Sequence, residues 1–389
     1  MRNEAADNLP QTIPPIGVNE MSLSARHWLA VAAVVVATMV VVPHAWSRAE
    51  RFSTGPDYRI PYALSSDYWL YRRWIERIRT EGDIPIVGDS VVWGEYVRPD
   101  GTLSHFLTRE AGAGVRFRNG GLNGVFPLAM EGLAARYGDG LSGRKVIVHY
   151  NMLWMSSPKA DLSTPNEETF NHTQLVPQAF GAVPCYRADA ATRLGVVASQ
   201  SLGFFAWVNH LDAVYFDQMS LPRWTLAEDG SQPPVRPNAW RNPLARIDLR
   251  TPGEPAIDPQ RGPSSPRHRP WNRSGAEPTH FEWVPVRRSL QWAAFRRTLA
   301  LLRSRGCDVL VVLGPFNEHM VSPDQRPLYR GMRDEICGWL RGRRVPVVVP
   351  DTLPSELYAD ASHPLTGGYA LLARRVAADP AFRAWLGAR

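Results

Sequence analysis

The sequence predicts an α/β fold built on a five-stranded parallel sheet, with one apolar helix before it. Five short apolar runs each have the length of a buried strand, and helical stretches lie between them. Near-continuous runs of Val, Ile and Leu are typical of parallel strands that are covered on both faces. Because strands and helices alternate, we expect βαβ units and a three-layer α/β/α sandwich. The five predicted strands are Ile84–Asp89, Val115–Asn119, Lys145–Tyr150, Asp308–Leu313 and Val345–Val349.

Length, charge and cysteine content exclude several classes of protein. A chain of 389 residues with 44% apolar residues can bury a large core, so global disorder is excluded. The formal net charge is +7, but the basic residues are scattered and form no compact tract, so no nucleic-acid partner is expected. The cysteines Cys185, Cys307 and Cys337 form no metal-binding pattern. Cys307 and Cys337 could pair outside the cytoplasm, and free buried thiols fit equally well.

An uncharged apolar segment near the N-terminus favours a membrane anchor. It runs from Trp28 to Val42 and, extended to Trp46, approaches the ~20 residues that a bilayer span needs. A cleaved signal peptide is the main alternative, but the 26 residues before the apolar run make a long n-region. A buried core helix is a third alternative, which the lack of a polar face disfavours. We expect a tail at 1–26, a single-pass transmembrane anchor at 27–46, a linker at 47–62 and an extracytoplasmic (periplasmic or extracellular) domain at 63–389.

Helix signals separate the predicted strands. Ser66 or Asp67 can cap a helix that ends at Gly82. Further helices are predicted at Leu128–Tyr137, Val286–Arg305, Leu328–Arg341 and Thr366–Ala378. The interval 155–283 breaks the alternation and is rich in Pro, Trp and Arg, so we interpret it as an insertion between the third and fourth strands. It contains a helical stretch, Ala188–Leu211, and a glycosylation sequon at Asn171-His172-Thr173.

Polar residues and glycines come directly after four of the predicted strands. In an open parallel sheet, sites form just beyond the carboxyl ends of the strands. These strand ends therefore predict one site. The first strand is followed by Ser90, the second by the glycine-rich turn 119–124 and the third by Asn151, while the fifth leads into Asp360 and His363.

These residue types are the ones that acyl transfer needs. A serine hydroxyl is a weak nucleophile until a histidine accepts its proton, and a carboxylate orients that histidine. Asp360 and His363 are three positions apart, so one turn of chain can bring them into contact. A backbone N–H at a glycine and an asparagine amide can both donate to an oxyanion. Each residue has a structural alternative, such as a helix cap for Ser90 or a turn for Asn151, and only the combination favours catalysis.

The four segments that follow these strands, which we call blocks, are residues 88–94, 119–124, 150–152 and 360–364. In these four blocks the sequence resembles the SGNH (GDSL) hydrolase superfamily. The resemblance spans about residues 84–378, with the insertion outside it. The GDSxxxG motif matches Gly88-Asp89-Ser90 with Gly94, and DxxHP matches Asp360, His363 and Pro364. The third block departs from the family pattern, because Tyr150-Asn151-Met152 stands where the family has Gly-x-Asn-Asp. The resemblance implies Ser90 as nucleophile, His363 as general base, Asp360 as its orienting carboxylate, and Ser90, Gly124 (Gly121 as second choice) and Asn151 as oxyanion donors.

Other residues beside the predicted site are candidates for substrate contact. Trp93 and Trp154 adjoin the catalytic blocks, and indole faces stack on sugar rings, although core packing is their usual role. The loop after the fourth strand supplies Asn317 and His319, the latter a spare base. Three tryptophans of the insertion could line a sugar-binding groove in the same way: Trp224, Trp240 and Trp271. These residues imply no metal and no organic cofactor.

The resemblance implies a serine esterase that removes acyl groups, acetyl first among them, through an acyl-serine intermediate. The expected substrate is an ester on a cell-envelope or extracellular carbohydrate. The alternative is an O-acetyltransferase that acts on polysaccharide with the same Ser-His-Asp residues. A further alternative is a catalytically silent envelope protein that binds glycan in the cleft. The oligomeric state does not follow from the sequence.

Overall fold

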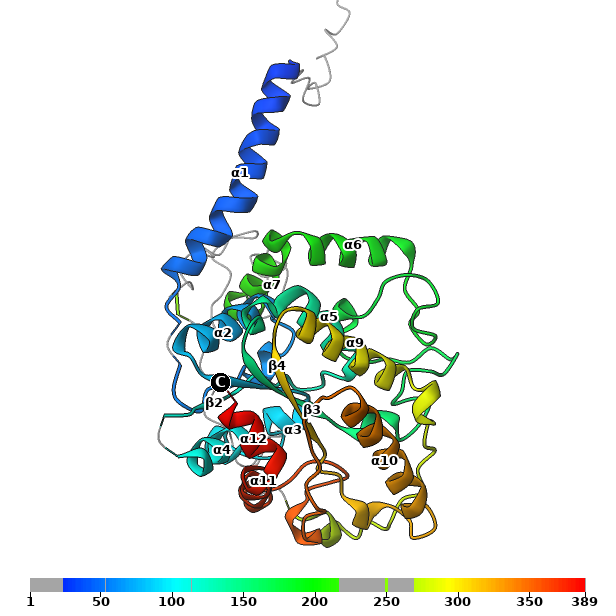
Figure 1. Cartoon of the computed structure of the whole chain (residues 1–389). Helices are drawn as coiled ribbons and strands as arrows, with labels where there is room; N and C mark the ends of the chain where they lie inside the picture. The colour runs from blue at the N-terminus through cyan, green and yellow to red at the C-terminus, as the bar shows by residue number, and fades with distance from the viewer. Residues whose placement is uncertain (1–23, 53, 113, 217–248, 251–268, 389) are drawn as a thin grey trace, which may run out of the picture. The chain divides into compact units, whose positions relative to one another are not determined.

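The computed structural model describes residues 24–52, 54–112, 114–216, 249–250 and 269–388 (Figure 1). The chain divides into two compact units, Met1–Arg48 and Ala49–Arg389. Helix α1 (Ala25–Ala49) contains the predicted anchor and is long and apolar enough to cross a membrane. Arg59 and Ile60, which belong to the predicted linker, are buried in the second unit.

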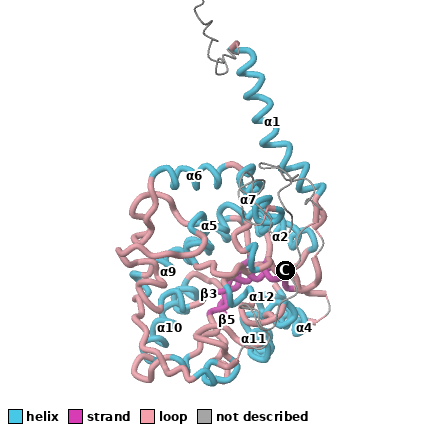
Figure 2. The backbone as a smooth tube through the Cα atoms, turned by 180° about the vertical axis from the view of Figure 1, so that it is seen from behind, coloured by secondary structure: helices cyan, strands magenta, loops and turns pink. Residues whose placement is uncertain are grey.

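The second unit is an α/β structure on a five-stranded, all-parallel sheet, as predicted. Figure 2 shows helices of this unit around the strands. The strand order is β2-β1-β3-β4-β5, with β1 paired to β2 on one side and β3 on the other. The chain therefore moves to one edge after β1 and returns past it to β3. Loops that leave β1 and β3 therefore run toward opposite edges of the sheet, the arrangement beside which doubly wound folds bind their ligands. The strands are β1 Ile84–Val87, β2 Phe117–Asn119, β3 Lys145–Tyr150, β4 Asp308–Leu313 and β5 Val347–Val348.

The predicted helices agree with the structure except at two places, and three helices were not predicted: Ser90–Trp93, Leu103–Ala111 and Pro380–Gly387. The predicted helix Val286–Arg305 is a 3-10 turn, Val286–Arg288, followed by α9 (Leu290–Ser304), because the Ser289 side chain caps α9 by accepting the N–H of Trp292. The predicted stretch Ala188–Leu211 is two helices, interrupted where Leu202 takes an extended conformation. The other helices are α2 Tyr68–Glu81, α3 Ser90–Trp93, α4 Leu103–Ala111, α5 Pro127–Tyr137, α6 Ala190–Ser201, α7 Gly203–Tyr215, α10 Arg326–Gly342, α11 Thr366–Ala378 and α12 Pro380–Gly387.

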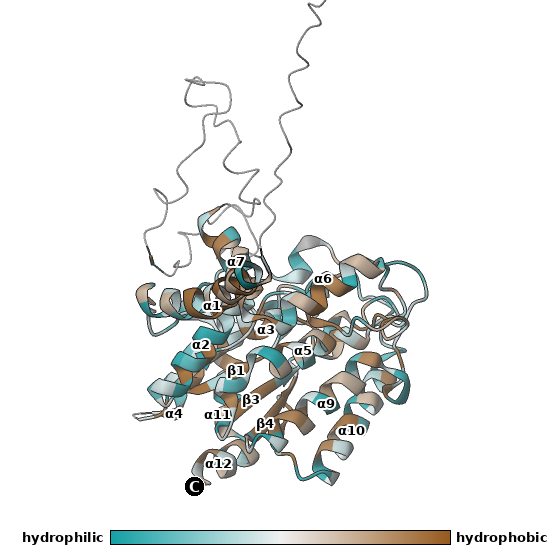
Figure 3. Cartoon of the chain, turned by 90° about the horizontal axis from the view of Figure 1, so that it is seen from above, coloured by the Kyte–Doolittle hydropathy of each residue, from teal (hydrophilic) through white to brown (hydrophobic). Residues whose placement is uncertain are grey.

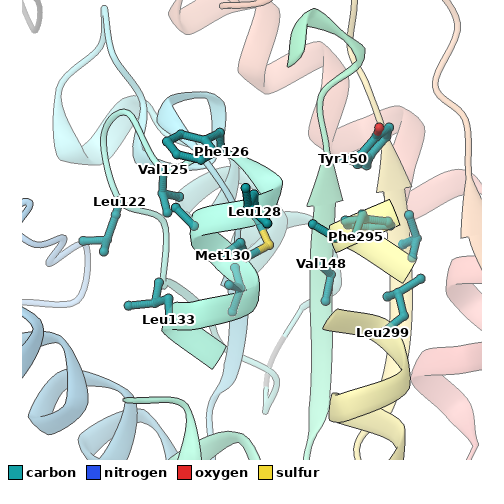
Figure 4. Close-up of a cluster of buried hydrophobic side chains, with 14 of the residues drawn as sticks. Leu122, Val125, Phe126, Leu128, Met130, Leu133, Val148, Tyr150, Phe295 and Leu299 are labelled. Carbon is teal, nitrogen blue, oxygen red and sulfur yellow. The ribbon is translucent and has the colours of Figure 1, made fainter. Parts of the chain in front are cut away.

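Alternate residues of the central strands enter two separate apolar clusters, so both faces of the sheet are buried. Val148 and Tyr150 of β3 face the cluster that includes α2, α5, α9 and α10, and Figure 4 shows them against Phe295 and Leu299 of α9. Ile147 faces the opposite cluster, to which α4, α11 and α12 contribute. Figure 3 shows hydrophobic residues concentrated on β3 and β4. A sheet buried on both faces explains why the strands read as near-continuous apolar runs.

The described part of the insertion packs on the rest of the second unit through buried polar contacts. His210 of α7 lies 2.6 Å from Asp67 Oδ2 and 3.0 Å from Glu50 Oε1, and all three side chains are buried. The cysteines Cys185, Cys307 and Cys337 are buried free thiols, so the pairing of Cys307 with Cys337 is not formed. Trp224 and Trp240 lie outside the described residues.

Candidate active site

Ser90, His363 and Asp360 form a continuous hydrogen-bonded series at the carboxyl end of the sheet. His363 Nε2 lies 2.8 Å from Ser90 Oγ, and His363 Nδ1 lies 2.7 Å from Asp360 Oδ2. Ser90 and His363 are each 8% exposed, so solvent reaches the pair but does not surround it. This arrangement can transfer a proton from a serine hydroxyl to an imidazole that a carboxylate orients.

The local sequence around Ser90 determines the position of its hydroxyl. Asp89 caps the single-turn helix α3 by accepting the N–H of Val91 at 3.0 Å, so Ser90 is the first residue of that helix. Gly94 ends α3 with a φ of 90°, in the left-handed region that favours glycine. The GDSxxxG spacing therefore defines one capped turn directly after β1, and Ser90 is a residue at a helix start as well as the partner of His363.

The loop that carries Asp360 and His363 is held by hydrogen bonds to its own backbone and by hydrogen bonds from Asn317 in the loop after β4. Asp360 Oδ1 accepts the backbone N–H groups of Ser362 and His363, each at 2.9 Å. Asn317 Nδ2 donates to the Asp360 carbonyl at 3.0 Å, and the Asn317 N–H donates to the Ala361 carbonyl at 2.8 Å. The loop after β4 thus fixes the loop after β5.

Neighbouring charges and hydrogen bonds favour the ionised forms of Asp360 and His363, the carboxylate and the imidazolium. Burial alone would raise the pKa of Asp360, but the charge of His363 and the hydrogen bonds from His363 and the backbone outweigh it and lower this pKa to about 2. Burial likewise acts to lower the pKa of His363, while Asp360, Asp89 and Glu95 raise it overall. The imidazolium that forms when His363 accepts a proton is therefore stabilised by nearby carboxylates.

Asp89 connects the nucleophile's helix to the end of β3. Its Oδ2 accepts Asn151 Nδ2 at 2.9 Å and Trp154 Nε1 at 2.8 Å. His149 Nδ1 lies 3.3 Å from Asp89 Oδ1. Burial acts to raise the pKa of Asp89, but His149, Asn151 and His363 together lower it. A buried carboxylate beside Ser90 therefore holds Asn151 close to the nucleophile.

The predicted oxyanion donors have unequal support. Within the described residues, the N–H groups of Ser90 and Gly124 donate no hydrogen bond. Gly124 has a φ of 70°, which favours glycine at this turn. The Gly121 N–H is already bonded to Asn119 Oδ1 at 3.0 Å, so Gly121 is the weaker of the two glycine candidates. One N–H of the Asn151 amide donates to Asp89, which leaves the other for a ligand.

Four residues predicted to contact substrate make contacts within the protein. Trp93 is fully buried, and its Nε1 donates to the Ile60 carbonyl at 2.7 Å. Asn317 is also fully buried and holds the Asp360 loop. His319 Nε2 lies 3.1 Å from the Leu353 carbonyl, so that nitrogen is engaged with the backbone. Trp271 is buried, with its Nε1 bonded to Ser355 Oγ at 3.1 Å.

The structure also brings unpredicted residues to the site. The Tyr96 ring meets His363 edge-on at 5.3 Å between centroids. Glu95 bonds Asn123 in the turn after β2, and burial raises the pKa of its carboxyl. Both directly follow the GDSxxxG motif, a position that could have marked them as site residues.

Comparison with protein-family models found no family that matches this chain. Comparison with curated proteins found no significant match. Among the described residues, no group of three or more His, Cys, Asp or Glu side chains could hold a metal ion. The functional interpretation therefore depends on the geometry of the site.

Proposed function

We propose that this protein is a serine esterase of the SGNH type, held in a membrane by α1, that removes acetyl or similar acyl groups from an envelope or extracellular carbohydrate. The hydrogen-bonded series Ser90–His363–Asp360 is the observation that carries the proposal. The strand order 2-1-3-4-5 is that of flavodoxin-like doubly wound sheets, which supports a three-layer SGNH fold. The main domain then lies outside the cytoplasm.

The reaction proceeds in two halves. Ser90 Oγ attacks the ester carbonyl while its proton passes to His363 Nε2, and Asp360 stabilises the imidazolium. The oxyanion accepts hydrogen bonds from the Ser90 and Gly124 N–H groups and the Asn151 amide. The ester C–O bond breaks, and His363 returns the proton to the leaving alkoxide, which yields an alcohol and acyl-Ser90. Water then loses a proton to His363 and attacks the acyl carbon, and Ser90 recovers that proton as the carboxylic acid leaves.

Labelling of the full-length chain in detergent with a fluorophosphonate tests the activated serine. We expect the label on Ser90, and its loss in Ser90→Ala and His363→Ala. Ser104→Ala is the matched control, since Ser104 is buried and bonded to Thr102 instead of a histidine. No label on folded wild-type protein would refute the esterase and favour the catalytically silent glycan-binding protein.

A second assay separates hydrolysis from transfer with the same residues. Acetate release from an aryl acetate that does not depend on added saccharide supports the esterase. Acetyl groups that appear on the saccharide in place of released acetate support the O-acetyltransferase.

A further inference from the structure

A histidine of the insertion contacts the turn that carries Gly124. His172 Nε2 lies 2.8 Å from the carbonyl oxygen of Asn123, and its Nδ1 lies 2.9 Å from the phenol oxygen of Tyr68. The residue is 7% exposed, and its φ of 57° lies in the left-handed region. A non-glycine residue in that region costs about 1–2 kcal/mol, so the contacts of His172 must outweigh this cost.

The two partners define a single tautomer of His172. A carbonyl oxygen can only accept, so Nε2 carries the hydrogen and donates to Asn123. Nδ1 is then an acceptor and takes the hydrogen of the Tyr68 hydroxyl. Burial lowers the pKa of His172 and raises the pKa of Tyr68, which keeps the imidazole neutral and the phenol a donor near neutral pH. Both ring nitrogens are engaged, and the ring has one orientation.

The Asn123 carbonyl and the Gly124 N–H belong to the same peptide group. That group is planar and trans, so the carbonyl and the N–H point to opposite sides. A hydrogen bond that holds the carbonyl of Asn123 therefore also fixes the direction of the Gly124 N–H. The Asn123 side chain is held separately by Glu95, which fixes the turn from a second side.

The neighbouring residue of the insertion encloses the turn further. A Cβ atom built on Gly124 would lie 2.6 Å from Asn171 Nδ2, so the Asn171 side chain occupies the space beside the glycine. Asn171 and His172 are consecutive, and together they meet Gly124 and Asn123. The insertion is thus in contact with the turn on which the proposed oxyanion donor lies.

We propose that His172 is a positioning residue that orients the Gly124 N–H toward the oxyanion. This role rests on the proposed function, because it requires an acyl-transfer step in which Gly124 donates to the oxyanion. Loss of one oxyanion donor slows catalysis by about 10²–10³-fold, and a misdirected donor loses part of that effect.

Steady-state kinetics of the full-length protein with 4-nitrophenyl acetate tests this role. His172→Phe keeps a ring but removes the donor, and we expect kcat to fall by about 10–100-fold while KM changes by less than about threefold. His172→Gln places an amide N–H near the position of Nε2, and we expect it to recover kcat to within about fivefold of wild type. His105→Phe is the matched control: His105 is bonded to Asp57 outside the site, and its variant should keep the wild-type kcat.

Each outcome decides the proposal. A wild-type kcat in His172→Phe, an effect on KM alone, or no recovery in His172→Gln would overturn the positioning role. If His172→Phe does not fold, Tyr68→Phe removes only the hydroxyl that engages Nδ1 and so fixes the orientation of the ring. A fall in kcat at constant KM supports the role, and an unchanged kcat overturns it. Fluorophosphonate labelling of wild type, done in parallel, separates the two proposals. Without a label on Ser90 both fall, whereas a labelled wild type with an unaffected His172→Phe overturns the positioning role alone.

Discussion

Replacement of Asp360 by asparagine tests the carboxylate of the site with little change in size. Both oxygens of Asp360 face His363 Nδ1, Oδ2 at 2.7 Å and Oδ1 at 2.9 Å. Oδ1 also accepts the backbone N–H groups of Ser362 and His363, each at 2.9 Å. An asparagine offers one acceptor oxygen and one donor NH₂ group, so it cannot replace both oxygens as acceptors.

Each orientation of the asparagine side chain impairs the site in a different way. If its oxygen faces the backbone, its NH₂ faces Nδ1 of His363, which must then be the acceptor. The ring hydrogen moves to Nε2, which can no longer take the proton of Ser90, and this wrong tautomer costs about 10⁴-fold in kcat where a Ser-His-Asp triad has been tested. If the NH₂ faces the backbone, two N–H groups lose their acceptor at about 1–3 kcal/mol each. We therefore expect kcat/KM to fall by about 10³–10⁴-fold, which corresponds to about 4–5 kcal/mol.

The assay is kcat/KM for 4-nitrophenyl acetate from acidic to alkaline pH, with the thermal unfolding temperature measured alongside. Catalysis needs neutral His363, and the net effect of its carboxylate neighbours is to raise its pKa. The wild-type rate should therefore rise with pH through a pKa above the usual 6.5, and this limb should move to lower pH in Asp360→Asn. Asp308→Asn, an exposed carboxylate bonded to Lys145 at the start of β4, is the control and should keep wild-type activity. An Asp360→Asn variant that keeps more than about a tenth of the activity, with an unshifted limb, would refute the reasoning.

The described contacts predict three further outcomes. Burial acts to lower the pKa of His210, but Asp67 and Glu50 raise it from 6.5 to about 9. The contribution of His210 to the free energy of unfolding should therefore be complete below about pH 6.5 and fall by about 3 kcal/mol as the pH rises through about 9. Urea unfolding across this pH range measures the loss, and a flat profile there would contradict it. Asn151→Ala removes the proposed oxyanion amide, and kcat for the aryl acetate should fall by about 10²-fold with little change in KM; an equal kcat would remove Asn151 from the oxyanion hole. Asn317→Ala removes the donor to the Asp360 loop, and we expect a lower unfolding temperature and about a tenfold lower kcat, whereas a change in KM alone would indicate substrate contact instead.

The sheet could be predicted from the sequence because burial on both faces produces unbroken apolar runs. All five strands are present, and β3 and β4 have the predicted bounds. The ends of the others depend on the adjoining loops and helices. β1 stops at Val87 because the next residues turn into the capped helix α3, and β5 pairs with β4 over only two residues. Strand ends are set by the neighbouring strand and loop, which apolar content does not describe.

The central residues of the site could be predicted because they occupy strand ends, whose meeting point follows from parallel topology. The partners of the side chains beside Ser90 could not, because closeness in sequence does not indicate where a side chain points. Trp93 is three residues from Ser90, yet its indole N–H is bonded to Ile60 and the Arg59 guanidinium lies 3.9 Å from the ring centroid. Those partners come from a segment that precedes the sheet. The contact of His172 with the turn after β2 could not be predicted for the same reason, because its partner Asn123 is 49 residues away in the sequence.

The start of α2 links the insertion to the site at two consecutive residues. Asp67, the cap of α2, is bonded to His210, and Tyr68, the first residue of the helix, is bonded to His172. The same helix turn therefore supports the two buried histidines in the described part of the insertion, and one of them holds the carbonyl of Asn123. Asn123 is half-buried, and the loss of a hydrogen bond to its carbonyl costs about 0.5–1.5 kcal/mol, so the insertion stabilises the observed conformation of the turn after β2. It follows that the insertion is part of the site's construction, and that a domain without it would need another donor to hold the Asn123–Gly124 peptide in this direction.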